Sequence, residues 1–182
     1  MSATSSMIAH QVGLSRVFWA RAALLGLLIA TPYALAQPVT SGAPASAQEA
    51  LHQELRDLKT RMQSALNKMD IDTVLANVTD DVVFTTMTGD RVRGRDGVRK
   101  YFEKMMKGPS PIVATVKTEF EADDLSRLHA NDSVAVAFGS SKDSYRLASG
   151  ETFEVTPQWS STMVRRDDKW LIANFHYSTN MF

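Results

Sequence analysis

The side chains best suited to acid–base chemistry in this sequence lie near its C-terminus, where His176 and Tyr177 are adjacent. Histidine titrates near neutral pH and can act as a general base, while the hydroxyls of Tyr177 and Tyr145 can donate hydrogen bonds to a ligand carbonyl. His176 and Tyr177 are therefore the candidate catalytic residues. Alternatively, His176 lies in the outer layer of a sheet or at a subunit interface, and the tyrosines are core aromatics with a polar tip at the edge.

These residues belong to a predicted β-hairpin, residues 158–178. Two runs of β-favouring residues flank the charged tetrad 166–169, which is typical of a turn in solvent. Alternation gives the second strand two faces: Trp170, Ile172, Asn174, His176 and Ser178 on one, and Leu171, Ala173, Phe175 and Tyr177 on the other. A turn with an odd number of residues places the Tyr177 face opposite Ser161. An even number shifts the pairing by one residue and exchanges the faces.

The sequence lacks the usual motifs for metal binding, nucleophilic catalysis and phosphate binding. The sequence has no cysteine, and the histidines beyond residue 36, namely His52, His129 and His176, are far apart, so zinc-type spacing is absent. Ser160 and Ser161 lack the glycine-flanked elbow of a hydrolase. No glycine-rich phosphate loop occurs. We therefore expect no metal and no cofactor.

The N-terminal 36 residues have the pattern of a secretory signal peptide. They contain two arginines, no acidic residue, an apolar run over residues 22–30, and a small-residue cleavage pattern ending at Ala36. The alternative is a membrane anchor, but the apolar stretch is shorter than the roughly 20 residues that a span needs and contains a proline. We expect a signal peptide over 1–36, a small, polar linker over 37–47, and a periplasmic or secreted domain over 48–182. Translation starts at Met1 or Met7.

Charge and size restrict the partners of the mature chain. Without the two arginines of the signal peptide, 18 basic residues stand against 20 acidic ones. A nucleic-acid partner requires a basic face, so none is expected, and no membrane contact is expected after cleavage. The remaining chain is long enough for one self-sufficient hydrophobic core without disulfides.

Hydrophobic periodicity predicts an α+β domain. Apolar residues recur every three or four positions from Leu51 to Met69, which indicates an amphipathic helix, and Asp72 is expected to cap a second, short helix. The predicted order is helix 51–69, helix 73–77, strands 82–87 and 91–93, helix 96–106, strands 112–128 and 133–147, and the hairpin 158–178. An antiparallel sheet folded over helices is the layer arrangement that this order favours.

Three segments resemble the nuclear transport factor two-like superfamily, which includes SnoaL-like proteins, steroid isomerases and the association domain of calcium/calmodulin-dependent protein kinase type II. They are Thr79-Asp80-Asp81-Val82, the stretch GDRVRGRDGVRKYFEKMM at 89–106, and VRRDDKWLIANFHYS at 164–178. The last two are most similar to the kinase association domain. The resemblance spans residues 48–180 and implies a cystatin-like, cone-shaped curved antiparallel sheet wrapped over three helices.

The resemblance also implies a pocket between the concave sheet and the helices. The expected lining residues are Phe84, Tyr101, Tyr145, Trp159, Ser161, Phe175 and Tyr177. Members of the superfamily commonly form dimers or larger rings, so a homodimer or ring is expected here. Since this fold hosts enzymes, binders and assembly modules alike, the resemblance does not specify one activity.

Two departures from the relatives narrow the function. Steroid isomerases use a carboxylate on the strand after the paired acids, but here Thr85 and Thr86 occupy that region, and residues 158–164 contain no acid. The kinase association domain carries pocket arginines where this chain has Ser161 and Tyr177. Two hypotheses follow. In the first, the chain is a cofactor-free, SnoaL-like protein that binds a small apolar or carbonyl-bearing molecule, or performs modest acid–base chemistry on it as an isomerase, cyclase or dehydratase does. In the second, it is a non-catalytic oligomerisation domain.

Overall fold

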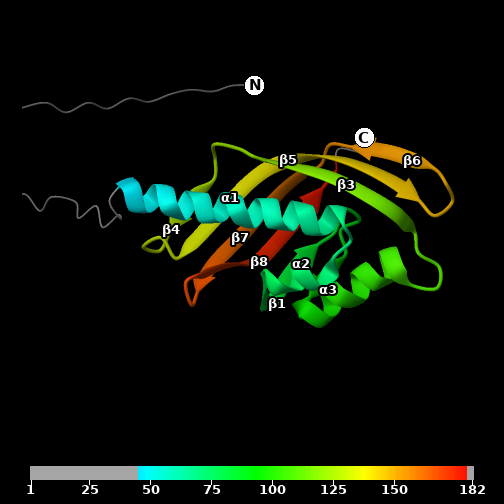
Figure 1. The fold of residues 1–182 in the computed structure, drawn as a ribbon, viewed down its shortest axis with the longest axis horizontal. Coiled ribbons are helices and arrows are strands. Elements are labelled where there is room, and N and C mark those ends of the chain that lie inside the picture. The colour runs from blue at the N-terminus through cyan, green and yellow to red at the C-terminus, as the bar shows by residue number, and fades with distance from the viewer. Residues whose placement is uncertain (1–44, 180–182) are drawn as a thin grey trace, which may run out of the picture. The chain divides into compact units, whose positions relative to one another are not determined.

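The computed structural model describes residues 45–179 (Figure 1). The predicted signal peptide and most of the predicted linker lie outside these residues. The first helix begins at Ala45, three residues before the expected domain boundary.

Three α-helices precede most of the sheet in the chain. Helix α1, Ala45–Asn67, buries an apolar stripe that includes Leu51, Leu58 and Ala65. The remaining helices are α2 (Ile71–Ala76) and α3 (Gly94–Phe102), the latter followed by a π-helical turn, η1 (Glu103–Lys107). Figure 1 shows α1 lying across one face of the sheet, and α2 and α3 lie together near the C-terminal end of α1.

The predicted cap of α2 is wrong by two residues. Asp70, not Asp72, is the N-cap, and its carboxylate accepts hydrogen bonds from the backbone N–H of Thr73 at 3.1 Å and from the Thr73 hydroxyl at 2.6 Å. The Asp70 N–H in turn donates to the carbonyl of Ala65 at 2.8 Å, while Met69 adopts φ 52°. This Schellman-type end of α1 leads directly into the cap of α2, which explains why α2 begins at Ile71.

The strands form one mixed sheet in the order β2-β1-β8-β7-β5-β3, with β4 and β6 also pairing with β5. The strands are β1 (Val78–Thr85), β2 (Arg91–Arg93), β3 (Val113–Ala122), β4 (Arg127–His129), β5 (Val134–Leu147), β6 (Thr152–Val155), β7 (Gln158–Arg166) and β8 (Lys169–Ser178).

The sheet differs from the expected antiparallel one in three respects. Strands β1 and β8 are parallel, so the curved sheet is mixed. The strand expected over residues 112–128 is divided into β3 and β4, and β6 is an additional short strand. Strand β1 begins at Val78, four residues earlier than expected, so Asp80 and Asp81 are exposed strand residues.

The register of the final hairpin combines both alternatives considered above. The turn is Asp167–Asp168, an even number of residues, and both have positive φ, as in a type I′ turn. A β-bulge at Ala173 then separates the pair Met163↔Ile172 from the pair Thr162↔Asn174. Because the bulge inserts one residue, β8 exchanges faces in the middle. Trp170, Ile172 and Tyr177 are consequently all buried.

Candidate functional site

A cavity of about 690 Å³ lies between α1, α3 and the sheet. Its walls are mostly aliphatic and aromatic. All seven residues expected to line a pocket do contribute to it: Phe84, Tyr101, Tyr145, Trp159, Ser161, Phe175 and Tyr177. His176 is exposed and does not line this cavity, so Tyr177 is the one of the two candidate catalytic residues that borders it.

Phe175 is the centre of the aromatic wall. Its ring stacks on Trp159 with centroids 6.0 Å apart and on Tyr177 at 5.6 Å. Phe120 and Phe84 pack against the same ring, each at 6.1 Å. Such contacts hold aromatic rings in fixed orientations, so this part of the wall is well ordered by its own packing.

One carboxylate, that of Asp143 on β5, is buried in this apolar wall with an exposed fraction of 3%. The hydroxyl of Thr118 donates to its Oδ1 at 2.6 Å. The hydroxyls of Tyr145, at 3.1 Å, and of Tyr177 both donate to Oδ2. The Ser141 hydroxyl lies 2.5 Å from that of Tyr177. A buried charge requires such partners, and three strands supply them here.

Burial raises the pKa of both tyrosines far above the usual value of 10, and the neighbouring Asp143 carboxylate raises each pKa further. An ionised tyrosine beside a carboxylate in an apolar cavity would combine desolvation with like-charge repulsion. Tyr145 and Tyr177 therefore remain protonated and act as hydrogen-bond donors rather than as bases.

Counting hydrogens shows what the cluster can offer a ligand. Since the Tyr177 hydrogen points to Asp143, the Ser141 hydroxyl must donate to the Tyr177 oxygen. The hydrogens of Tyr145 and Thr118 are also directed at Asp143. All four hydroxyl hydrogens are used within the cluster, whereas a carboxylate and several hydroxyl oxygens keep acceptor capacity. A ligand group at this point is favoured if it donates a hydrogen bond or a proton.

Helix α1 holds the β3 side of the cluster in place. β3 ends the strand order of the sheet, and its outward backbone groups bond to α1 side chains. The Asn67 amide accepts from the Thr118 N–H at 2.7 Å and donates to the Thr118 carbonyl at 3.1 Å. The Gln63 side chain accepts from the Phe120 N–H at 2.9 Å. Asn67 thereby fixes the backbone of a residue whose hydroxyl bonds to Asp143.

Sequence reasoning missed Asp143 because it sought an acid only in the strand after Asp81 and in residues 158–164. A signal was present in the strand expected over 133–147. Ser141, Asp143 and Tyr145 alternate there, so they share one face. An acid between two hydroxyl residues on one face of a strand is unusual for a surface that packs on helices.

Within residues 45–179, no group of three or more His, Cys, Asp or Glu side chains is arranged to hold a metal ion. The helices in this range include none that is long and apolar enough to cross a membrane. Ser161, one of the expected lining residues, donates to the Asn174 carbonyl at 3.1 Å.

Comparison with known proteins gives a family and a fold. The model of the SnoaL-like domain matches residues 60–172. A search of curated proteins found no match. Similar solved structures include a nuclear transport factor 2-like superfamily protein from Salmonella enterica, with 18% identity, a TM-score of 0.62, and coverage of 72% of this chain and 92% of that one.

Two other structures illustrate the range of proteins with this fold. A hexachlorocyclohexane dehydrochlorinase of LinA type 3 from Novosphingobium barchaimii has 14% identity and a TM-score of 0.63, over 76% of this chain and 92% of that one. A protein similar to the calcium/calmodulin-dependent protein kinase II association domain, from Xanthomonas campestris, has 22% identity and a TM-score of 0.60, over 71% and 87%. At these identities the likeness establishes the fold, which is the expected one.

Proposed function

Because the chain belongs to the SnoaL-like domain family, we propose that it binds a small, mainly apolar molecule in its cavity and transfers a proton on it without a cofactor. The observation that carries this proposal is the carboxylate of Asp143, which is buried in an apolar wall and accepts three hydroxyl hydrogen bonds. A carboxylate is costly to bury, and one that borders an apolar cavity is a reasonable functional centre.

The proposed chemistry uses Asp143 as the base. Its carboxylate takes a proton from an acidic C–H or O–H group of the ligand. The Tyr145 hydroxyl makes the longest bond of the cluster, 3.1 Å, and turns to donate to the ligand oxygen that gains negative charge. The proton then returns to another atom of the ligand, as in an isomerase, or it protonates a leaving hydroxyl group, which departs as water while a double bond forms, as in a dehydratase. One structural relative is a dehydrochlorinase, whose reaction is also an elimination.

A binding test uses 2-naphthol and 2-methoxynaphthalene, which differ in one hydrogen-bond donor. We expect calorimetry to show tighter binding of 2-naphthol, and the Asp143→Asn substitution to remove most of that preference. Equal affinities for the two compounds, or an absence of binding by both, would contradict the proposed site.

A test of chemistry follows hydrogen–deuterium exchange at the acidic carbon of 2-tetralone in heavy water by NMR. The protein is expected to accelerate exchange over buffer, and Asp143→Asn is expected to abolish the acceleration. His176→Asn is a matched control on the outer face and should exchange at the wild-type rate. If only the His176 variant lost the accelerated exchange, the base would be His176 and the proposal for Asp143 would be wrong.

We also propose that the protein assembles as a homodimer or ring and that it is exported. One structural relative is similar to the calcium/calmodulin-dependent protein kinase II association domain, which supports assembly. Light scattering that shows only monomers would refute assembly.

Residues 1–36 support periplasmic or secreted localisation, and mass spectrometry of the mature protein should find Gln37 at its N-terminus.

A further inference from the structure

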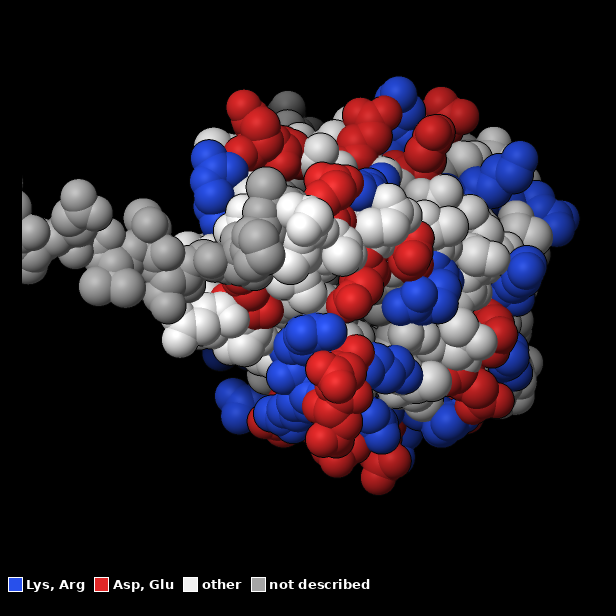
Figure 2. Space-filling view, turned by 60° about the vertical axis from the view of Figure 1, so that its left-hand side comes forward, with Lys and Arg blue, Asp and Glu red and all other residues white. Residues whose placement is uncertain are grey.

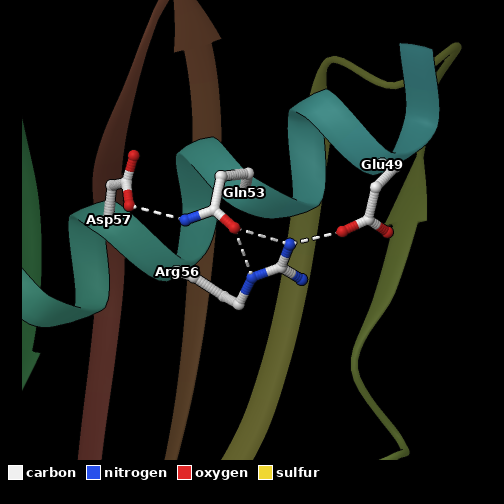
Figure 3. A network of polar contacts seen from close by, with 4 residues as sticks. All are labelled: Glu49, Gln53, Arg56 and Asp57. Carbon is white, nitrogen blue, oxygen red and sulfur yellow. Dashed lines mark hydrogen bonds and ion pairs between the residues drawn. The ribbon is translucent and has the colours of Figure 1, made fainter. Parts of the chain in front are cut away.

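The cavity borders solvent at two ends that differ in chemistry. Where α1 begins, the exposed lining residues include the charged side chains of Arg56 on α1, Arg127 on β4 and Asp123 in the loop before β4. Figure 2 presents this end of the molecule and shows acidic and basic side chains interspersed there. The Arg56 guanidinium pairs with Glu49 and donates to Gln53, so it is held along the surface of α1 (Figure 3). An apolar molecule that entered here would remove water from charged groups, which is unfavourable.

The other end of the cavity is apolar. Four large apolar side chains are exposed within residues 45–179, and two of them, Ile112 at 48% and Phe153 at 39%, line the cavity. Both lie against the last residues of β5. The Ile112 carbonyl accepts a hydrogen bond from the Ala148 N–H at 2.9 Å, and Phe153 on β6 pairs with Tyr145. A side chain that lines a cavity and also contacts solvent marks the rim of an opening, so an apolar ligand is expected to enter at this end.

This opening lies beside the proposed base. Asp143 precedes Tyr145 by two residues on β5, so the two side chains share a face of the strand, and both line the cavity. The Tyr145 hydroxyl donates to the Asp143 carboxylate at 3.1 Å. The pairing of β5 with β6 places Val155 opposite Asp143 and Phe153 opposite Tyr145. Of the two residues at the rim, Phe153 is therefore the nearer to Asp143 along the sheet.

Phe153 restrains the Tyr145 ring. The two rings are nearly parallel, with centroids 5.0 Å apart and planes inclined by 13°, which makes them the closest aromatic pair of the described residues. Tyr145 packs against no other aromatic ring of residues 45–179, whereas Tyr177 packs against Phe175. A movement of Tyr145 within its own plane preserves the stacking, but a tilt out of the plane breaks it. Phe153 is thus the aromatic contact that fixes the plane in which the Tyr145 hydroxyl can move.

We propose that Phe153 is a positioning residue for the reaction: it covers the opening beside Asp143 and, through ring stacking, holds the Tyr145 hydroxyl where it meets the ligand oxygen. The inference rests on the proposed function, in which Tyr145 donates to the oxygen that gains negative charge. Such a hydrogen bond is stronger in the transition state than in the ground state. Loss of the stacking should therefore lower kcat and leave KM nearly unchanged.

The test follows hydrogen–deuterium exchange of 2-tetralone over a range of concentrations, which gives kcat and KM separately. Phe153→Leu keeps an apolar side chain at the opening but removes the stacked ring, so kcat should fall about two- to tenfold, and KM should change less than about twofold. Phe153→Tyr keeps the stacking and should restore the wild-type kcat. Phe138→Leu is the matched control and should also keep the wild-type kcat, because Phe138 on β5 is equally exposed, at 39%, but does not line the cavity.

A second substitution, Tyr145→Phe, distinguishes positioning of the hydroxyl from simple covering of the opening. It keeps the stacked ring and removes the hydroxyl, so adding Phe153→Leu to it should lower kcat no further. An equal loss with and without the Tyr145 hydroxyl, or a wild-type kcat in Phe153→Leu, would overturn the inference and leave the role of Asp143 intact. If the wild-type protein did not accelerate exchange, the proposed function would fail and this inference with it.

Discussion

Replacing Asn67 by alanine tests whether helix α1 only stabilises the fold or also positions the carboxylate of Asp143. The Asn67 amide makes two hydrogen bonds to the backbone of Thr118, at 2.7 and 3.1 Å. Each contributes about 1 kcal/mol net, and the higher helix propensity of alanine returns a few tenths of a kcal/mol. We expect Asn67→Ala to lower the free energy of unfolding by about 1 to 2 kcal/mol.

The same substitution should also weaken ligand binding. Without Asn67, the Thr118 backbone is less constrained, so its 2.6 Å hydroxyl bond to Asp143 is weakened. A loss of about 1 kcal/mol corresponds to roughly a fivefold weaker binding of 2-naphthol. Gln63→Ala is the control, because Gln63 holds the neighbouring residue Phe120 through one hydrogen bond and makes none to the cluster.

The two variants are compared by urea denaturation and by calorimetry with 2-naphthol. Gln63→Ala should lose about 1 kcal/mol of stability and keep the wild-type affinity. If both variants weaken binding equally, the effect is general loosening of the β3 edge and not transmission through Thr118. If Asn67→Ala leaves affinity unchanged, Asp143 does not depend on α1 for its position.

Three further predictions concern the cavity wall and the packing of β5 against its neighbours. Asp143→Asn should lower stability by about 1 to 3 kcal/mol, measured by urea denaturation, because its amide nitrogen cannot accept the hydroxyl hydrogens. Gly139→Ala should cost about 3 kcal/mol or more, since the added Cβ would lie 1.9 Å from the Glu121 carbonyl oxygen, and a thermal melt within a few degrees of wild type would contradict that packing. Because folding raises the pKa of Tyr145 and Tyr177 above 10, the stability that they contribute is fully present below pH 10 and is lost as pH rises above it. Unfolding curves between pH 8 and 11 should show this decline, and a Tyr177→Phe variant should show a smaller one.

Local sequence determined the secondary-structure elements and the residues that line most of the cavity. The period of apolar residues predicted α1, and the charged tetrad predicted the hairpin turn at Asp167–Asp168. The seven predicted lining residues all border the cavity, because strand alternation and the family resemblance both act on short segments. These properties depend on neighbours within a few residues, which a sequence shows directly.

Tertiary structure decided what the cavity can do. The parallel pairing of β1 with β8 and the bulge at Ala173 result from packing between distant segments, and the bulge turns both Ile172 and Tyr177 inward. Two of the three partners of Asp143 come from other strands: Thr118 lies 25 positions before it and Tyr177 lies 34 positions after it. No local period encodes such a meeting, since it depends on register across the sheet. Alternation placed the adjacent residues His176 and Tyr177 on opposite faces of the strand but left the register open, and the fold shows that Tyr177 is the one that faces the carboxylate.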